Sequence, residues 1–108
     1  MALSLLPLVI AAALVAAPFG SGPGEPPAIV REARLAVEGD SAPRVGARWS
    51  ARLARDSTDS AALLGLATLA RLTYDYPLAE RLYRRLAAGP ADRFAVYARL
   101  GLASRGWW

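Results

Sequence analysis

The side chains that carry most enzymatic proton and group transfer are missing from this 108-residue chain. It contains no histidine and no cysteine, and all thirteen of its basic residues are arginine. The chain therefore lacks the commonest general base, the thiol nucleophile and the amine that forms Schiff bases. It also shows no glycine-rich phosphate loop and no metal-ligand spacing. We expect a protein that is not an enzyme and that uses no cofactor and no metal.

Paired carboxylates are the one catalytic chemistry that the composition leaves formally possible. The nine acids are scattered along the chain, however. Asp40, Asp59 and Asp75 stand where helices are expected to begin, and a carboxylate there caps the free backbone N–H groups of the first turn. Capping therefore accounts for these three acids without a catalytic role.

Arginine favours binding, because a guanidinium holds a carboxylate through two parallel hydrogen bonds. Arginines interleaved with acids are also typical of a solvated helix face, where they would pair with Glu32, Glu38 or Asp92. The net charge of +4 is modest for a chain that binds nucleic acid. We expect an acidic protein partner, and neither nucleic acid nor a small-molecule substrate.

Helices must position these side chains. The first is expected to begin at Pro27 and to end at Gly39. The second should be capped by Asp40 or Ser41 and should run to about Arg55. Two further helices are expected over residues 60–73 and 77–88, separated by turns at residues 56–59 and 74–76. The second of these ends at the stop signal Gly89-Pro90.

A period of thirty-four residues runs through residues 29–104 without a gap. Large apolar, small and aromatic residues recur at matching positions of successive units. The matches are Ile29, Leu63 and Tyr97; Ala33, Ala67 and Gly101; Ala36, Ala70 and Ser104; Pro43 and Pro77; Val45 and Ala79; Trp49 and Tyr83. Self-similarity at this spacing in helical segments indicates a stacked helix-hairpin solenoid.

The pattern of large, small and aromatic residues resembles the tetratricopeptide repeat family. The middle unit carries the family positions at Leu63, Leu66, Ala67, Ala70, Ala79, Tyr83 and Pro90, and the third unit opens with Tyr97, Leu100, Gly101 and Ser104. Two departures stand out: Glu32 replaces an expected leucine, and Pro90 arrives one residue early. The resemblance implies an all-α solenoid of antiparallel hairpins over residues 28–108. It divides into a degenerate repeat (28–59), a full repeat (60–93) and a half repeat (94–108).

In this family the first helices of successive units line a groove that holds a peptide or helix of a partner protein. By register, the resemblance places six residues in that groove: Arg31, Arg34, Thr68, Arg71, Arg99 and Leu102. The lysine and asparagine carboxylate clamp of some members is missing, because the chain has neither residue type. The row of arginines favours an acidic segment or a free carboxylate.

The repeat also predicts the core. A helix over residues 60–73 that is apolar around much of its circumference should be buried on two sides. Trp49 should pack against that helix, because its register partner Tyr83 does so for the next one. The best-buried residues are expected to be Leu63, Leu66, Ala67, Leu69, Ala70, Ala79, Leu82, Tyr83 and Leu86.

The N-terminus is expected to be a targeting segment. Residues 1–19 are almost entirely apolar, and the first charge is Glu25. Residues 1–22 fit a cleaved signal peptide, with a membrane anchor or a buried helix of the domain as alternatives, although Pro7 interrupts a spanning helix. Residues 23–27 form a Gly/Pro linker. Without cysteine there is no disulfide and no lipoprotein attachment site.

These observations favour an exported scaffold or adaptor in the periplasm or cell envelope, whose groove holds a protein partner. It would touch the membrane only through an uncleaved N-terminal segment. The alternative is the N-terminal repeat region of a larger enzyme or signalling protein, similar to repeats that precede caspase-like peptidase modules. The third unit stops after its first helix, so we also expect an uncapped end that exposes Tyr97, Leu100 and both C-terminal tryptophans.

Overall fold

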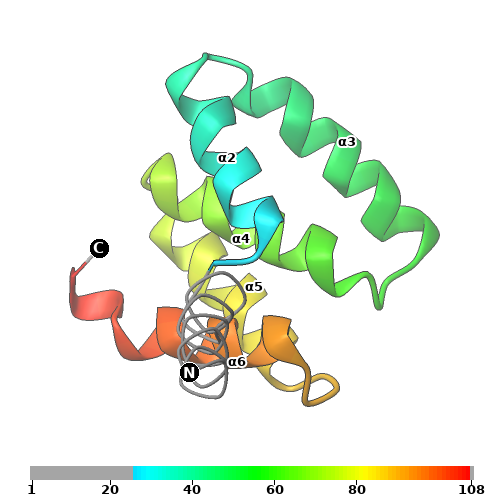
Figure 1. Ribbon diagram of the computed structural model, residues 1–108, viewed down its shortest axis with the longest axis vertical. Helices are drawn as coiled ribbons and strands as arrows, with labels where there is room; N and C mark the ends of the chain where they lie inside the picture. Colours follow the sequence, from blue (N-terminus) through cyan, green and yellow to red (C-terminus); the bar gives the residue numbers. More distant parts are fainter. Residues whose placement is uncertain (1–25, 108) are drawn as a thin grey trace, which may run out of the picture.

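Five α-helices make up most of the part of the chain that the computed structural model describes, residues 26–107. They are α2 (Ala28–Glu38), α3 (Ala42–Arg55), α4 (Ser60–Leu72), α5 (Tyr76–Ala87) and α6 (Arg93–Ala103), followed by a short 3-10 helix at Arg105–Trp107 (Figure 1). The all-helical prediction is confirmed over this range. The predicted targeting segment, residues 1–22, lies outside it. Within residues 26–107, no helix has the length and apolar character needed to cross a membrane.

Aspartate caps begin three of the helices. The carboxylates of Asp59, Asp75 and Asp92 accept hydrogen bonds from the backbone N–H three residues on, at the starts of α4, α5 and α6. The predicted caps at Asp59 and Asp75 are therefore confirmed. At α3 the predicted Ser41 does occupy the cap position, but it makes no side-chain cap, and its hydroxyl donates to the carbonyl of Ala36.

The turns that join α2 to α3 and α4 to α5 have the same backbone geometry. Asp40 and Tyr74, thirty-four residues apart, adopt left-handed φ angles of 58° and 67°. In both turns the next backbone N–H reaches back to a carbonyl five residues earlier, from Ser41 to Ala36 and from Asp75 to Ala70, at 2.8 Å. This closure is a Schellman-type helix end, which usually has glycine at the left-handed position. Here the packing holds two side-chain-bearing residues in that conformation.

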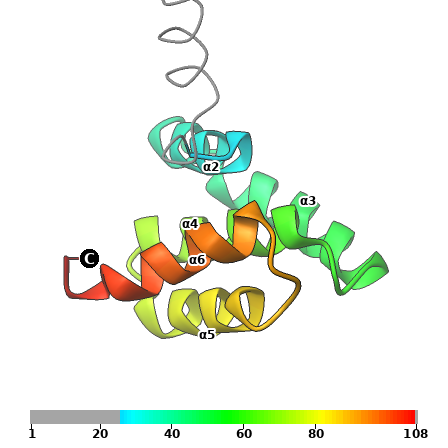
Figure 2. The ribbon, with the colours of Figure 1, turned by 60° about the horizontal axis from the view of Figure 1, so that its bottom comes forward.

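Helix α4 is the centre of the fold and contacts α2, α3, α5 and α6. Figure 2 shows α2 and α5 on opposite sides of it. Helix α2 lies against α4 more closely than against its own hairpin partner α3. The reason is that α2 turns four buried residues, Ile29, Val30, Ala33 and Ala36, toward the core, whereas α3 buries only Trp49.

Two aromatic rings sit on glycines of the next helix along the stack. Trp49 of α3 is fully buried, and a Cβ built at Gly65 of α4 would lie 2.7 Å from its ring. The same Cβ would lie 3.0 Å from Ile29 of α2, so Gly65 is where three helices meet. Tyr83 of α5, 1% exposed, meets Gly101 of α6 in a similar way, at 3.1 Å. The predicted packing of Trp49 against the third helix is confirmed.

Most of the predicted core is confirmed. Seven of the nine predicted residues are buried: Leu63, Ala67, Leu69, Ala70, Ala79, Tyr83 and Leu86. Leu66 and Leu82 are only partly buried, while Leu64, left out of the prediction, is fully buried. At the α6 end, Leu100 is 56% exposed as expected. Tyr97 packs partly against the core instead of standing free.

The left-handed turn at Tyr74 predicts a gain in stability on substitution by glycine. A non-glycine residue in this conformation costs about 1 kcal/mol, and Tyr74 is 78% exposed, with its ring edge-on to Tyr76. Tyr74→Gly should therefore be about 1 kcal/mol more stable than Tyr74→Ala, which loses the same ring but keeps the strain. Chemical denaturation of the full chain measures the difference. Equal stabilities would contradict the assigned turn.

The close contact at Gly65 predicts the opposite response to alanine at two helical glycines. Gly65→Ala should destabilise the fold by about 1–3 kcal/mol, because its methyl group would overlap the Trp49 ring. Gly46→Ala on α3 is the matched control: its Cβ would meet Leu69 at an ordinary 3.4 Å. Alanine's higher helix propensity should make that variant neutral or more stable by up to about 1 kcal/mol. Thermal unfolding of both variants measures the two changes in stability. Equal losses of stability in Gly65→Ala and Gly46→Ala would refute the contact between Gly65 and Trp49.

Candidate functional site

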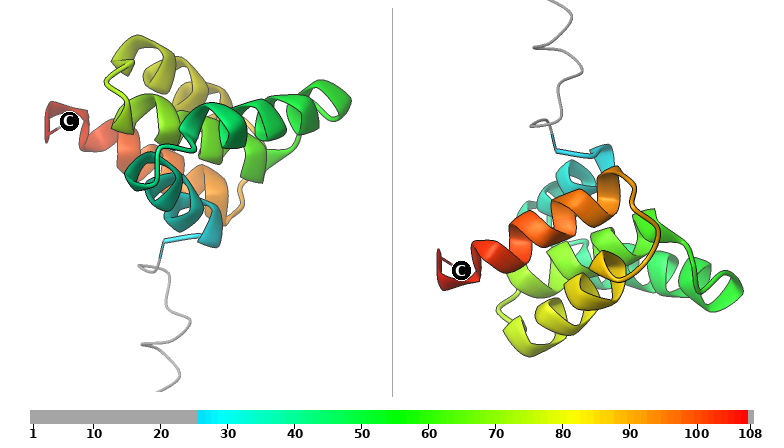
Figure 3. Two further views of the ribbon diagram at one scale, coloured as in Figure 1. Left: turned by 90° about the horizontal axis from the view of Figure 1, so that it is seen from above. Right: turned by 90° about the horizontal axis from the view of Figure 1, so that it is seen from below.

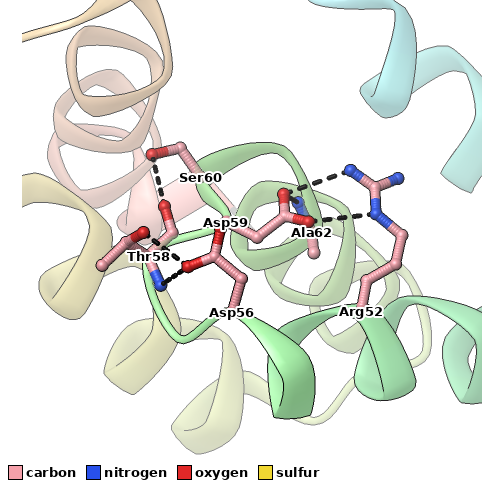
Figure 4. A network of polar contacts seen from close by, with 6 residues as sticks. All are labelled: Arg52, Asp56, Thr58, Asp59, Ser60 and Ala62. Atoms are coloured by element: carbon pink, nitrogen blue, oxygen red, sulfur yellow. Dashed lines mark hydrogen bonds and ion pairs between the residues drawn. The ribbon is translucent and has the colours of Figure 1, made fainter.

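Two acids, Asp56 and Asp59, lie near each other in the turn between α3 and α4 (Figure 4). Asp59 accepts two hydrogen bonds from the guanidinium of Arg52, at 3.0 and 3.1 Å, and a third from the backbone N–H of Ala62. Asp56 accepts from the hydroxyl and the backbone N–H of Thr58, at 2.6 and 3.0 Å. Each carboxylate is thus occupied by partners from its own turn or from α3.

Both carboxylates are held in the ionised form. Hydrogen bonds from Thr58 lower the pKa of Asp56. The backbone N–H of Ala62, and then the Arg52 guanidinium, lower the pKa of Asp59. A carboxylate with a lowered pKa carries no proton to donate at neutral pH. Among residues 26–107 no group of three or more acids, histidines or cysteines is placed to hold a metal ion. The arrangement braces the turn and ties α3 to the start of α4.

The six predicted groove residues do not form one exposed surface. Arg31 and Arg34 are exposed on α2. Thr68 is fully buried, with its hydroxyl donating to the carbonyl of Leu64 at 2.7 Å, so its placement in an open groove is wrong. Arg71 donates to the hydroxyl of Tyr83 at 3.2 Å. These residues therefore differ in what they can offer a partner.

The remaining two predicted groove residues belong to α6. Arg99 is exposed and donates to the carbonyl of Ala87 at 3.2 Å. Leu102 is partly buried and packs against the core. The burial of Thr68 follows from the position of α4, which four other helices contact.

An open groove lies elsewhere, between α3 and α5, with α4 as its floor. Its volume is about 480 Å³. The floor and one wall are apolar, with Leu66, Leu69 and Ala70 from α4 and Leu78 and Leu82 from α5. The other lining residues are Ala42, Pro43, Gly46 and Ser50 from α3, and Thr73 and Asp75 from the α4–α5 turn.

This groove and the predicted one use opposite faces of α4. At 100° per residue, Leu66, Leu69 and Thr73 lie about 150° around the helix from Thr68 and Arg71. No Cα atom of α3 lies within 8 Å of α5, although both helices pack on α4. Figure 3 shows α3 reaching outward past the other helices toward the α3–α4 turn. The two second helices thus stand apart and leave the leucines of α4 partly uncovered between them.

Ion pairs take up much of the acidic charge in the described part of the chain. Glu32 pairs with Arg48 at 3.7 Å, and Glu80 with Arg84 at 2.8 Å and with Arg105. The predicted partners of the groove arginines are used otherwise here: Glu32 pairs with Arg48 of α3, and Asp92 caps α6. Within residues 26–107, five arginines have no charged or hydrogen-bonding partner: Arg34, Arg44, Arg55, Arg81 and Arg93, the last of which lies over the ring of Phe94.

Comparisons with protein-family models, with curated proteins and with solved structures found no match to this chain. The tetratricopeptide resemblance therefore stays a prediction from the residues.

Sequence reasoning missed the groove residues because it placed the binding surface on the first helices. One signal was available. Leu66, Leu69 and Thr73 form a stripe on α4 at helical spacing, opposite small residues of α3 such as Gly46 and Ser50. Small residues on one wall leave space over the leucines of the floor, which is the composition that an open apolar groove requires.

The Arg52–Asp59 contact predicts an acid-sensitive part of the stability. Asp59→Ala removes a helix cap and a bidentate ion pair and should cost about 1–2 kcal/mol at neutral pH. Because the folded-state pKa of Asp59 lies below the unfolded value of about 3.9, this contribution is present above that value. It is lost as the pH falls through the folded pKa.

The control for this prediction is Asp56→Ala. Asp56 is exposed and contacts only Thr58, so the loss should be smaller. Denaturation curves collected from neutral pH to below pH 4 test both variants. The wild-type and Asp59→Ala curves should converge on acidification. A constant difference between them at all pH values would contradict the assigned role of Asp59.

Proposed function

We propose that this chain is a protein-interaction scaffold, a short stack of helical hairpins that binds a helix or extended segment of a partner protein. The observation that carries the proposal is the solvent-open apolar groove between α3 and α5. Apolar clefts of this kind, with a few polar groups at the edge, are the usual sites of ligand and peptide binding. The two carboxylates of the α3–α4 turn act as structural braces in this account.

Two repeated features support a stacked-repeat architecture of the tetratricopeptide kind. The left-handed turn residues Asp40 and Tyr74 recur thirty-four residues apart. The aromatics Trp49 and Tyr83, also thirty-four residues apart, each pack on a glycine of the following helix, although these glycines, Gly65 and Gly101, are thirty-six residues apart. In a solenoid each unit contacts mainly its neighbours, and such repeats present extended binding surfaces. The proposed binding surface lies between second helices and not between first helices.

The arginines of the first helices keep a secondary place in the proposal. Arg31 and Arg34 are exposed and could attract an acidic partner over distances of up to about 10 Å at 0.1 M ionic strength. Arg71 and Arg99 would first have to give up hydrogen bonds to Tyr83 and Ala87. We also propose, from the apolar residues 1–19, that the protein is exported and meets its partner in the cell envelope.

Site-specific photo-crosslinking in the native cells tests the scaffold proposal. A benzophenone amino acid at Ser50, an exposed residue of the groove, should give a discrete adduct with one protein species. The matched control is the same amino acid at Arg34, which is exposed on α2 and outside the groove. Mass spectrometry identifies the adducts. The same set of adducts from both positions, or none from either, would refute the groove as the binding site.

A further inference from the structure

The two walls of the α3–α5 groove differ in charge. On α5, Arg81 and Arg85 follow Leu78 and Leu82 by three residues each, which places them beside these leucines on the outer edge of the groove. On α3 the corresponding edge carries only small or uncharged residues: Pro43, Ala47, Ser50 and Ala54. The α5 edge of the groove is therefore basic, and the α3 edge is uncharged and formed by small side chains.

The two arginines are held differently. Arg81 is exposed and has no ion-pair or hydrogen-bond partner among residues 26–107. Arg85 donates to the carbonyl of Ser57 at 3.0 Å, from α5 to the turn that follows α3. The lining ends at Ser50 and Leu82, so this bond spans the end of the groove. Arg85 thus presents a hydrogen-bonded guanidinium, and Arg81 presents an exposed one without a bonded partner along the edge.

The opposite end of the groove has the opposite charge. Asp75 lines it there and caps α5 by accepting from the backbone N–H of Leu78 at 3.3 Å. The charge along the α5 wall therefore changes from negative at Asp75 to positive at Arg81 and Arg85. The groove would therefore select a ligand by the order of charges along it as well as by its apolar surface.

We propose that the occupant of the groove is an amphipathic helix of a partner protein, with acidic residues flanking its apolar stripe on the side of Arg81 and Arg85. This inference rests on the proposed scaffold function. The volume of about 480 Å³ suits one row of large side chains, so a helix would lie on the groove with one apolar face inserted. The low α3 edge lets its backbone approach closely. Its carboxylates can then form charge-assisted hydrogen bonds with the guanidinium groups.

Charge complementarity selects this occupant over the chain's own apolar segment. Residues 1–19 carry no charged side chain, so they could not use the basic edge. The chain as a whole has a net charge of +4, which favours encounter with an acidic partner. A second copy of the chain would bring a like net charge to the same edge.

Binding of synthetic peptides to the full 108-residue chain tests the proposal. The probe is a fluorescein-labelled amphipathic peptide of about 18 residues, long enough for a helical face, with a leucine stripe flanked by glutamates. A second probe replaces the glutamates by glutamines. Fluorescence anisotropy gives both dissociation constants. The glutamate peptide should bind several-fold more tightly, and the difference should shrink as salt rises.

Two variants and a control separate the charge from the groove. Arg81→Glu should weaken the glutamate peptide by roughly three- to tenfold and leave the glutamine peptide unchanged. Arg93→Glu makes the same charge change at an exposed residue of α6 that does not line the groove, and should alter neither. Ser50→Trp puts a ring into the groove from its exposed edge and should weaken both peptides. Circular dichroism confirms that each variant keeps its helical fold.

The outcomes distinguish the two proposals. Suppose that Ser50→Trp weakens the binding of both peptides, but Arg81→Glu does not weaken the glutamate peptide more than the glutamine peptide. The groove is then a binding site, but the proposal of an acidic occupant is wrong. If Ser50→Trp also has no effect, both proposals fall. A peptide of residues 3–17 serves as competitor: displacement of the glutamate peptide at equal or lower concentration would make the chain's own segment the occupant and overturn the inference.

Discussion

The fold depends on the contact between an aromatic ring of one helix and a glycine of the next. Three helices meet at Gly65 of α4, because the Trp49 ring of α3 and the Ile29 side chain of α2 both pack against this residue, which has no Cβ. Burying a tryptophan side chain of about 200 Å² contributes up to about 5 kcal/mol, which is comparable to the whole stability of a small domain. Because the ring fits only over glycine, the contact also fixes where α3 lies along α4.

The same contact explains why a groove exists at all. Trp49 is the only residue of α3 that is fully buried, whereas Ala42, Val45 and Leu53 pack only partly against the core, so much of the surface of α3 stays open. The Arg52–Asp59 ion pair holds its far end at the next turn. Helix α5 packs on another side of α4 and does not reach α3. Leucines of α4 and α5 therefore line the floor and one wall of the groove, because no further helix within residues 26–107 covers them.

Local signals in the sequence predicted where the helices begin and end. Features that depend on long-range packing could not be predicted from these signals. Prolines 43 and 77, the aspartates at helix starts and the Gly89-Pro90 stop set the bounds because their effects act within one turn. The contact of Trp49 followed from its register with Tyr83. The burial of Thr68 could not be predicted in this way, because it depends on how closely the neighbouring helices approach α4.

Two features could not be predicted from local signals alone. The left-handed residues at the hairpin turns are an aspartate and a tyrosine, where glycine is the residue that marks such a turn. The α3–α5 groove depends on the distance between two helices whose Cα atoms stay more than 8 Å apart, and residue spacing alone does not set that distance. Thr68 was misplaced for a similar reason, because residue spacing does not show that neighbouring helices cover its face of α4.

The most direct test of this account is a nuclear Overhauser measurement on the full chain. It should show cross-peaks between the Hα protons of Gly65 and the Hε3 and Hζ3 protons of the Trp49 indole. It should show them also between Gly101 Hα and the ring protons of Tyr83. Both sets together would establish that the aromatic-on-glycine contact repeats along the stack. Their absence in a folded sample, with the Trp49 ring contacting other residues instead, would contradict the packing from which the groove and its proposed function follow.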